Sequence, residues 1–117
     1  MVHDDTEFAT DVVAGLRQAA YDVMAFADSH SALDAMEAAR TVELVITPVQ
    51  FPPGQPNGVS LGLMARNKRR GVKILFLARP ENEGFADGIG EVLVAPVTAN
   101  DVVAKAQEIL SESPDRA

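Results

Sequence analysis

The sequence predicts an α/β domain in which a parallel sheet is covered by helices on both faces. Four short apolar runs are continuous rather than alternating, which is typical of strands that are buried on both sides. Between these runs, apolar residues recur every three to four positions, as they do along one face of a helix. Strands that alternate with helices are joined by right-handed crossovers and therefore run parallel. The pattern indicates a doubly wound sheet.

The predicted strands differ in how well they are defined. In chain order they cover residues 23–26, 44–46, 74–77 and 92–94. A fifth fragment, Met1 and Val2, precedes an acidic stretch. Because this strand is central in a doubly wound sheet, two apolar residues are few for it. Either the strand begins upstream of Met1 or it is stunted, and we favour the first interpretation.

The predicted helices have apolar stripes and recognisable ends. The stripes are Phe8, Val12 and Leu16; Ala32, Leu33 and Met36; Leu61, Met64 and Ala65; and Val102, Val103, Ala106 and Leu110. Asp28 or Ser29 is expected to cap the second helix, and Thr98 with Asp101 to begin the last one. Gly58 is expected to open the third helix.

The segment between residues 77 and 92 departs from the regular pattern. It contains Pro80 and three glycines, so a helix there is confined to residues 81–87, about two turns. The sequence therefore predicts that the helix before the last strand is shortened.

Length and composition indicate one globular domain. The chain has 117 residues, of which 47% are hydrophobic and 23% charged, and these are values of a folded domain. We expect residues 1–111 to form the domain and residues 112–117 to be a frayed tail. The absence of cysteine excludes disulfides, thiolate metal sites and cysteine nucleophiles.

Charge argues against binding of nucleic acid, and the lack of a long apolar run argues against a membrane-spanning segment. The formal net charge is -7, which disfavours phosphate backbones. The basic cluster of Arg66, Lys68, Arg69 and Arg70 ends a predicted helix, where the helix dipole favours cations; nucleic-acid contact is the alternative. No apolar run approaches the roughly 20 residues that span a bilayer, and the acidic start is unlike a signal peptide. We expect a cytoplasmic protein.

Five stretches together resemble the receiver domain of bacterial two-component response regulators (CheY-like). They are AAYDV at 19–23, ADSHSAL at 27–33, ELVIT at 43–47, the Pro- and Gly-containing loop at 51–58, and VLVAPVT at 92–98. Their order and spacing carry the resemblance, which runs from Val2 to about Leu110. It implies a flavodoxin-like sheet of five parallel strands in the order 2-1-3-4-5, here with a shortened fourth helix and a first strand that is either truncated at Met1 or stunted.

The resemblance also implies which positions carry phosphotransfer. In receivers, two acidic residues after the first strand and a phosphoacceptor Asp after the third hold Mg²⁺ through oxygen ligands. A hydroxyl residue ends the fourth strand, and a Lys precedes a Pro after the fifth. An aromatic residue on the fifth strand moves with the phosphoryl group.

This chain departs from that pattern at nearly every position. The acidic pair falls on His3 and Asp4, or on Asp4 and Asp5 with a shift of one. The phosphoacceptor falls on Pro48, the hydroxyl on Ala78, the aromatic residue on Val92 and the lysine on Ala95, and only Pro96 is retained beside the acidic residues. Proline has no nucleophile and at most two carboxylates remain. We therefore expect no phosphotransfer, no tight metal site, no cofactor and no enzymatic activity.

Three further residues have alternative interpretations. His3 with Asp4 and Asp5 could hold a transition metal, but a third ligand is not evident, and a remnant of the acidic pocket is favoured. Thr47 is a candidate surrogate phosphoacceptor, although we expect a Thr that ends a strand and faces helix or solvent. His30 is expected to be a solvated surface residue.

The resemblance with these losses implies a pseudo-receiver: a phosphorylation-independent module of a two-component phosphorelay that binds a signalling protein, such as a histidine kinase or regulator module. A homodimer is a further expectation. The expected partner face consists of Val92, Ala95, Thr98, Asp101, Val102 and Lys105. The alternatives are a small-ligand sensor, with the pocket made apolar by Pro48, Ala78 and Ala95, and an active receiver that uses Asp4 or Thr47 as acceptor.

Overall fold

The computed structural model describes residues 1–3, 5–38, 42–49, 58–68, 71–81, 84 and 88–111. The helices are α1 (Thr6–Gln18), α2 (Ser29–Ala38), α3 (Gly58–Lys68) and α4 (Ala99–Ser111), and the strands are β1 (Leu44–Pro48), β2 (Lys73–Ala78) and β3 (Glu91–Val94). The predicted tail at 112–117, most of the loop before α3 and most of the predicted short helix at 81–87 lie outside the described residues.

The three strands form a parallel sheet in the order β1-β2-β3. Two short segments extend it beyond β1. The Val2 N–H donates to the Ile46 carbonyl at 2.8 Å, and the His3 N–H donates to the Phe26 carbonyl at 2.9 Å. The spatial order is therefore Phe26, residues 1–3, β1, β2 and β3, which is the predicted order. The predicted strand at 23–26 is wrong in its extent, because within it only Phe26 forms a bridge and Met24 is 66% exposed.

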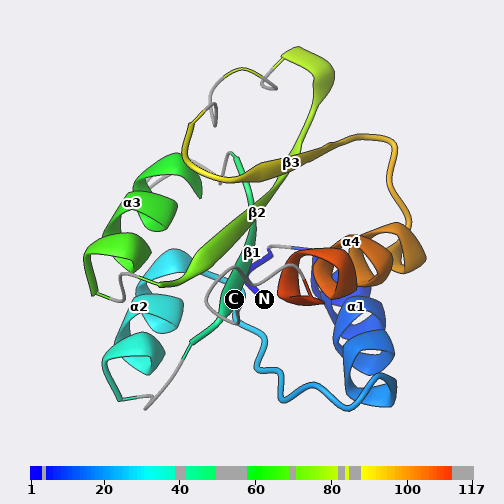
Figure 1. Cartoon of the computed structure of the whole chain (residues 1–117), viewed down its shortest axis with the longest axis horizontal. Helices are drawn as coiled ribbons and strands as arrows, with labels where there is room; N and C mark the ends of the chain where they lie inside the picture. The colour runs from blue at the N-terminus through cyan, green and yellow to red at the C-terminus, as the bar shows by residue number, and fades with distance from the viewer. Residues whose placement is uncertain are drawn as a thin grey trace.

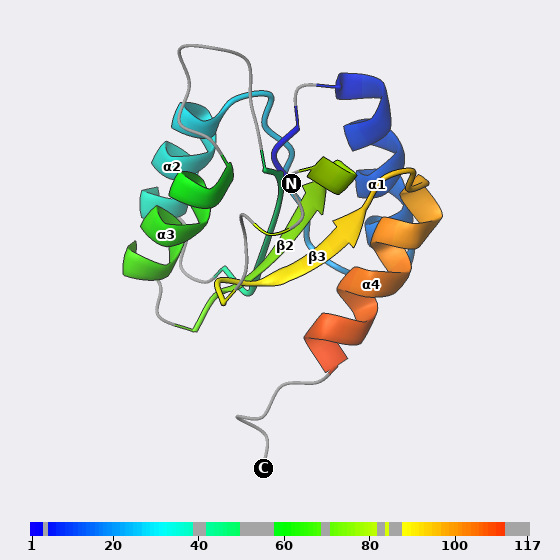
Figure 2. The same ribbon diagram turned by 90° about the horizontal axis from the view of Figure 1, so that it is seen from above.

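Helices cover both faces of this sheet in three layers. Helices α2 and α3 lie on one side and α1 and α4 on the other (Figures 1 and 2). Side chains alternate between the two cores, as the pleat of a strand requires. Val45 and Phe76 pack toward α2 and α3, whereas Ile46 and Leu75 pack toward α1 and α4. This double burial explains why the strand sequences are continuously apolar.

The helices begin where the sequence places capping residues. The Asp5 side chain accepts a hydrogen bond from the Phe8 N–H at 3.1 Å at the start of α1. Before α4, the Thr98 hydroxyl and the Asp101 carboxylate accept hydrogen bonds from each other's backbone N–H groups at 3.1 and 2.9 Å. Such reciprocal pairs satisfy two donors that a helix start otherwise leaves unpaired. The predicted start of α4 is confirmed. Among the described helices, none is long and apolar enough to cross a membrane.

Asp28 gives the start of α2 a dependence on pH. Its carboxylate accepts hydrogen bonds from the Ser31 N–H at 2.8 Å and the Ser31 hydroxyl at 3.0 Å. Both hydrogen bonds lower the pKa of Asp28, and the one from the Ser31 backbone N–H has the larger effect. A lowered folded-state pKa stabilises the protein above the unfolded-state pKa of about 3.9, and this stabilisation disappears as pH falls through the folded-state value.

We expect Asp28→Asn to melt below the wild type at neutral pH and this difference to shrink as the pH falls below the unfolded-state pKa of about 3.9, because asparagine caps helices but cannot ionise. Thermal melts of both proteins between these pH values measure the effect. A difference in melting temperature that stays constant down to about pH 3 would contradict it.

The start of α3 lies in close backbone contact with the end of β1. The Gly58 N–H donates to the Val49 carbonyl at 2.6 Å. A Cβ atom at Gly58 would lie 1.7 Å from the carbonyl oxygen of Pro48, so a side chain does not fit there. Gly58 thus opens α3, as predicted, because it lets the helix start directly against the end of β1.

Candidate functional site

The strand ends bring three of the predicted pocket residues to one edge of the sheet. Pro48 ends β1, Ala78 ends β2 and Ala95 follows β3. The Val49 N–H donates to the Leu77 carbonyl at 3.1 Å, and the Ala95 N–H donates to the Ala78 carbonyl at 2.7 Å. Neighbouring strand ends are therefore paired up to the pocket. In open α/β sheets this carboxyl edge is where ligands bind.

These three positions are apolar and carry no reactive group. Pro48 is buried, Ala78 is 4% exposed and Ala95 is half-buried. The peptide bond between Ala95 and Pro96 is cis. Proline fits the end of β1 because the peptide groups that pair with β2 belong to its neighbours Thr47 and Val49. These positions supply no nucleophile, no hydroxyl and no cation.

Thr47, the candidate surrogate acceptor, is fully buried. Its side chain is 0% exposed, and its hydroxyl donates a hydrogen bond to the Pro48 carbonyl at 3.0 Å. The alternation of β1 places it on the same side as Val45 and Val49, which pack in the core below α2 and α3. A phosphodonor in solution does not reach this hydroxyl in the described conformation.

The acidic end of the pocket is only partly described, because Asp4 lies outside the described residues. Asp5 is exposed and caps α1. His3 is half-buried, its Nδ1 accepts a hydrogen bond from the Asp5 N–H at 2.9 Å, and its ring lies 5.1 Å from that of Phe8. Within the part of the chain that the structure describes, no three His, Asp or Glu side chains are grouped to hold a metal ion.

The predicted partner face needs one correction. Val102 is 0% exposed and packs with Ala106 and Ile109 in the core between the sheet and the helix pair of α1 and α4. The four-residue and seven-residue spacing of these side chains explains why Val102 points inward. It does not belong to an accessible face. Val92 and Ala95 are half-buried, and Thr98 and Asp101 are exposed.

Lys105 links α4 to β3 on this face. Its ammonium lies 3.2 Å from the Glu91 carboxylate and 3.4 Å from that of Glu108. The hydrogen bond to Glu91 is the main cause that raises the pKa of Lys105, with a smaller contribution from Glu108. The surface beside β3 therefore presents an ordered group of one cation and two carboxylates.

The basic cluster and the isolated histidine do not form a site in the described residues. Lys68 forms an ion pair with Glu37 of α2, and its hydrogen bond lowers the pKa of Glu37. Arg66 is exposed, and residues 69–70 lie outside the description. His30 is exposed on α2.

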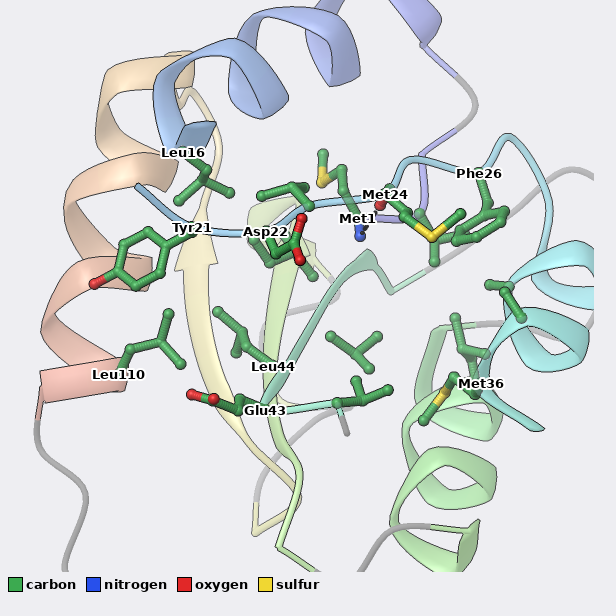
Figure 3. Close-up of a pocket in the computed structure, with 18 residues that line it drawn as sticks. Met1, Leu16, Tyr21, Asp22, Met24, Phe26, Met36, Glu43, Leu44 and Leu110 are labelled. Carbon is green, nitrogen blue, oxygen red and sulfur yellow. Dashed lines mark hydrogen bonds between the residues drawn. The ribbon is translucent and has the colours of Figure 1, made fainter. Parts of the chain in front are cut away.

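A cavity that the sequence analysis missed lies at the opposite, amino-terminal end of the sheet. Its volume is about 430 Å³, and it is lined by residues 21–24 and 26, the start of β1 and side chains from the flanking helices (Figure 3). The amino group of Met1 points into it and donates a hydrogen bond to the Met24 carbonyl at 2.9 Å. Burial lowers the pKa of this amino group to about 6. No motif in the sequence marks this cavity, because its lining comes from segments that are far apart in the chain.

Comparison with known proteins identifies the fold. No family model and no curated protein matches the sequence. A CheY-like receiver domain from Methanospirillum hungatei superposes with a TM-score of 0.82 at 24% identity over 99% of this chain and 94% of that one. A receiver protein from Sinorhizobium medicae gives 0.80 at 18% identity over 95% and 91%. The receiver domain of NtrX from Brucella abortus gives 0.80 at 18% identity over 96% and 97%. The predicted receiver-like, flavodoxin-like fold is confirmed.

Proposed function

We propose that this chain is a pseudo-receiver, a module of two-component-type signalling that binds a protein partner without being phosphorylated. One observation supports this function above all others. Three adjacent strand ends at the ligand-binding edge of the sheet carry Pro48, Ala78 and Ala95. The resemblance to receivers puts a carboxylate, a hydroxyl and a lysine at these positions.

The chemistry of phosphotransfer gives this observation its weight. Transfer needs an attacking carboxylate and positive charge that stabilises the phosphoryl oxygens as they develop charge. Proline and two alanines provide neither. A hydroxyl that follows a new phosphoryl group is also missing, so the partner face has no phosphorylation signal to respond to. Binding is then governed by the face itself.

The proposed partner face, after removal of Val102, consists of Val92, Ala95, Thr98, Asp101 and Lys105. Val92 and Ala95 supply a small apolar centre, and the ion pairs of Lys105 with Glu91 and Glu108 border it. An apolar centre with a charged rim is typical of protein interfaces. The partner is a signalling protein of the cytoplasm, such as a histidine kinase or regulator module, and a second copy of the chain is the other candidate.

Incubation with a small phosphodonor and Mg²⁺ tests the loss of phosphotransfer. We expect the intact mass of the protein to stay unchanged, because the strand ends offer no acceptor. A stoichiometric gain of one phosphoryl group would contradict the proposal. The variants Thr47→Ala and Asp4→Asn, analysed in parallel, would then show whether a surrogate residue accepts the group.

Capture of partners without any phosphodonor tests the face. Glu91→Lys reverses a charge beside Lys105, and Asp11→Lys makes the same change on the exposed side of α1, where no contact is proposed. Specific partners should be lost with the first variant and retained with the second. Equal capture by both, or capture that requires a phosphodonor, would contradict the proposed face. Light scattering of the purified chain separates a homodimer from a monomer.

A further inference from the structure

Helix α3 carries apolar side chains on the side that faces away from the sheet as well as on the side that packs against it. Figures 1 and 2 show α3 in an outer layer, with the sheet on one side of it. On the outer side, Leu63 is 52% exposed and Met64 is 42% exposed. Among the described residues, three large apolar side chains are exposed, and two of them are these neighbours. Scattered apolar residues are normal on a protein surface, whereas adjacent ones indicate a contact surface.

The charge around these two side chains is opposite to that of the rest of the chain. Residues 44–80 contain six Lys and Arg and no Asp or Glu, whereas the other residues contain four Lys and Arg and all 17 Asp and Glu. Arg66 and Lys68 lie in the last turn of α3. Lys68 forms an ion pair with Glu37, but Arg66 is exposed and has no ion-pair partner in the described part of the chain. The surface of α3 therefore offers a cation that can pair with an acidic group from outside.

The exposed residues of α3 form one continuous surface. Leu63 is followed by Arg66 and Asn67 three and four positions later, and Met64 by Asn67 three positions later, so these side chains are neighbours on the helix. We call Leu63, Met64, Arg66 and Asn67 the α3 patch. A ridge of side chains spaced in this way fits into the groove of another helix.

The position of Arg66 sets the direction of a helix that packs on this patch. Arg66 lies in the last turn of α3, and Leu63 and Met64 come before it. Acidic residues are favoured in the first turn of a helix, because the helix dipole is positive there. If the second helix runs antiparallel to α3, its acidic first turn meets Arg66 and its following turns meet the apolar pair. The patch is thus complementary in charge and polarity to such a helix.

Other occupants fit the α3 patch less well. In a two-fold contact between two copies, the last turn of one α3 meets the first turn of the other, and that turn has no acidic residue. Two chains with a net charge of -7 also repel each other. For nucleic acid, α3 offers no aromatic side chain on which a base could stack, and its apolar pair would lie against phosphates.

We propose that the α3 patch binds an amphipathic helix of a partner protein, antiparallel to α3, with acidic residues in the first turn of that helix and an apolar stripe after them. A contact made by one helix face is smaller than a standard interface of about 1,600 Å², so the complex is transient. The patch lies in the opposite layer from α4 and does not rest on the proposed function.

A designed peptide tests the proposal directly. The probe is the acetylated peptide Asp-Glu-Glu-Leu-Leu-Gln-Ala-Leu-Gln-Ala-Leu-Leu-Gln-Ala with a fluorophore at its carboxyl end, and fluorescence anisotropy reports binding. We expect saturable binding that weakens with added salt and is lost when lysines replace the three acidic residues. Absence of saturable binding, or equal binding of the lysine peptide, would overturn the proposal.

Two arginine variants locate the acidic turn of the bound peptide. Arg79 is exposed and belongs to the same acid-free stretch, but it follows the carboxyl end of β2, whereas the last turn of α3 precedes the start of β2. Arg66→Glu should weaken peptide binding at least about tenfold, and Arg79→Glu should leave it nearly unchanged. Melting temperatures show that both variants are folded. Equal affinity of the two variants would place the peptide elsewhere and refute the α3 patch.

Two methionine variants test the apolar part of the contact. Met64→Ala should weaken peptide binding about tenfold, whereas Met24→Ala, the same change at an exposed methionine outside α3, should not. Equal effects of the two changes would contradict the proposal.

Two further measurements separate the partner helix from the other occupants. A fluorescent DNA duplex that binds as tightly as the peptide, and equally to the wild type and Met64→Ala, would show a general polyanion site and overturn the proposal. If light scattering shows a dimer that Met64→Ala dissociates while the peptide does not bind, the patch is a contact between copies, and the proposal of a partner helix is overturned.

Discussion

Replacing Gly58 by alanine is expected to lower the free energy of unfolding by roughly 3 kcal/mol, the upper part of the range for an overpacked site. The added Cβ would lie 1.7 Å from the Pro48 carbonyl oxygen and 2.7 Å from its carbon, and both are backbone atoms that no rotamer change can move. Relief requires α3 to shift away from β1, which breaks the hydrogen bond between Gly58 and Val49. Chemical denaturation of the wild type and the variant measures the loss.

Gly71 provides the matched control for this substitution. A Cβ at Gly71 meets no atom within 4 Å, and its φ is not in the left-handed region. Gly71→Ala should therefore be neutral, or stabilising by up to about 1 kcal/mol through the unfolded chain. Equal stability of the two alanine variants would show that the end of β1 and the start of α3 are not as close as described.

The second large effect is expected at Phe76 in the central strand. Its side chain is 0% exposed and packs in the core below α2 and α3. A Cβ added at Gly62 of α3 would approach the ring Cζ to 2.9 Å, so the ring and helix are in close contact. Phe76→Ala should lower the free energy of unfolding by about 3–5 kcal/mol, because the cavity left behind cannot collapse fully.

Met64 of α3 serves as the control for the loss of a large apolar side chain. It is 42% exposed, so Met64→Ala should cost less than about 1 kcal/mol. Both free energies come from the same denaturation measurement. A loss below about 1 kcal/mol at Phe76 would contradict the described packing of α3 on the sheet.

The sequence predicts the inner strands and the helix starts well because their signals are local. The runs at 44–46, 74–77 and 92–94 are continuously apolar, since both faces of each strand are covered, and they are confirmed as β1, β2 and β3. Thr98 and Asp101 cap α4 through atoms that lie three residues apart. The run at 23–26 resembles the others in composition, but only Phe26 pairs with a neighbouring segment and Met24 is exposed. Composition alone does not show whether a run has a neighbour to pair with along its length.

The candidate site is predicted less completely, because burial depends on contacts that are distant in sequence. Pro48, Ala78 and Ala95 reach the same edge because parallel strands end together, and the order of elements is enough to infer this. Thr47 is fully buried because helices pack over β1. The residues next to Thr47 in the sequence do not reveal this packing. Val102 already belonged to the predicted apolar stripe with Ala106, so its place on the predicted partner face conflicted with that stripe. The cavity was missed because its lining comes from segments that are distant in sequence.

The uneven pairing of the sheet implies that stability is distributed unevenly across the molecule. Strand β2 is bonded on both sides within the described sheet, so its amides are freed only when the whole domain unfolds. Within the described part of the chain, residues 22–26 are linked to the sheet by the bridge at Phe26 and by the hydrogen bond from the Met1 amino group. Amides at this edge are therefore expected to exchange with solvent through local opening that costs less free energy than the opening of β2.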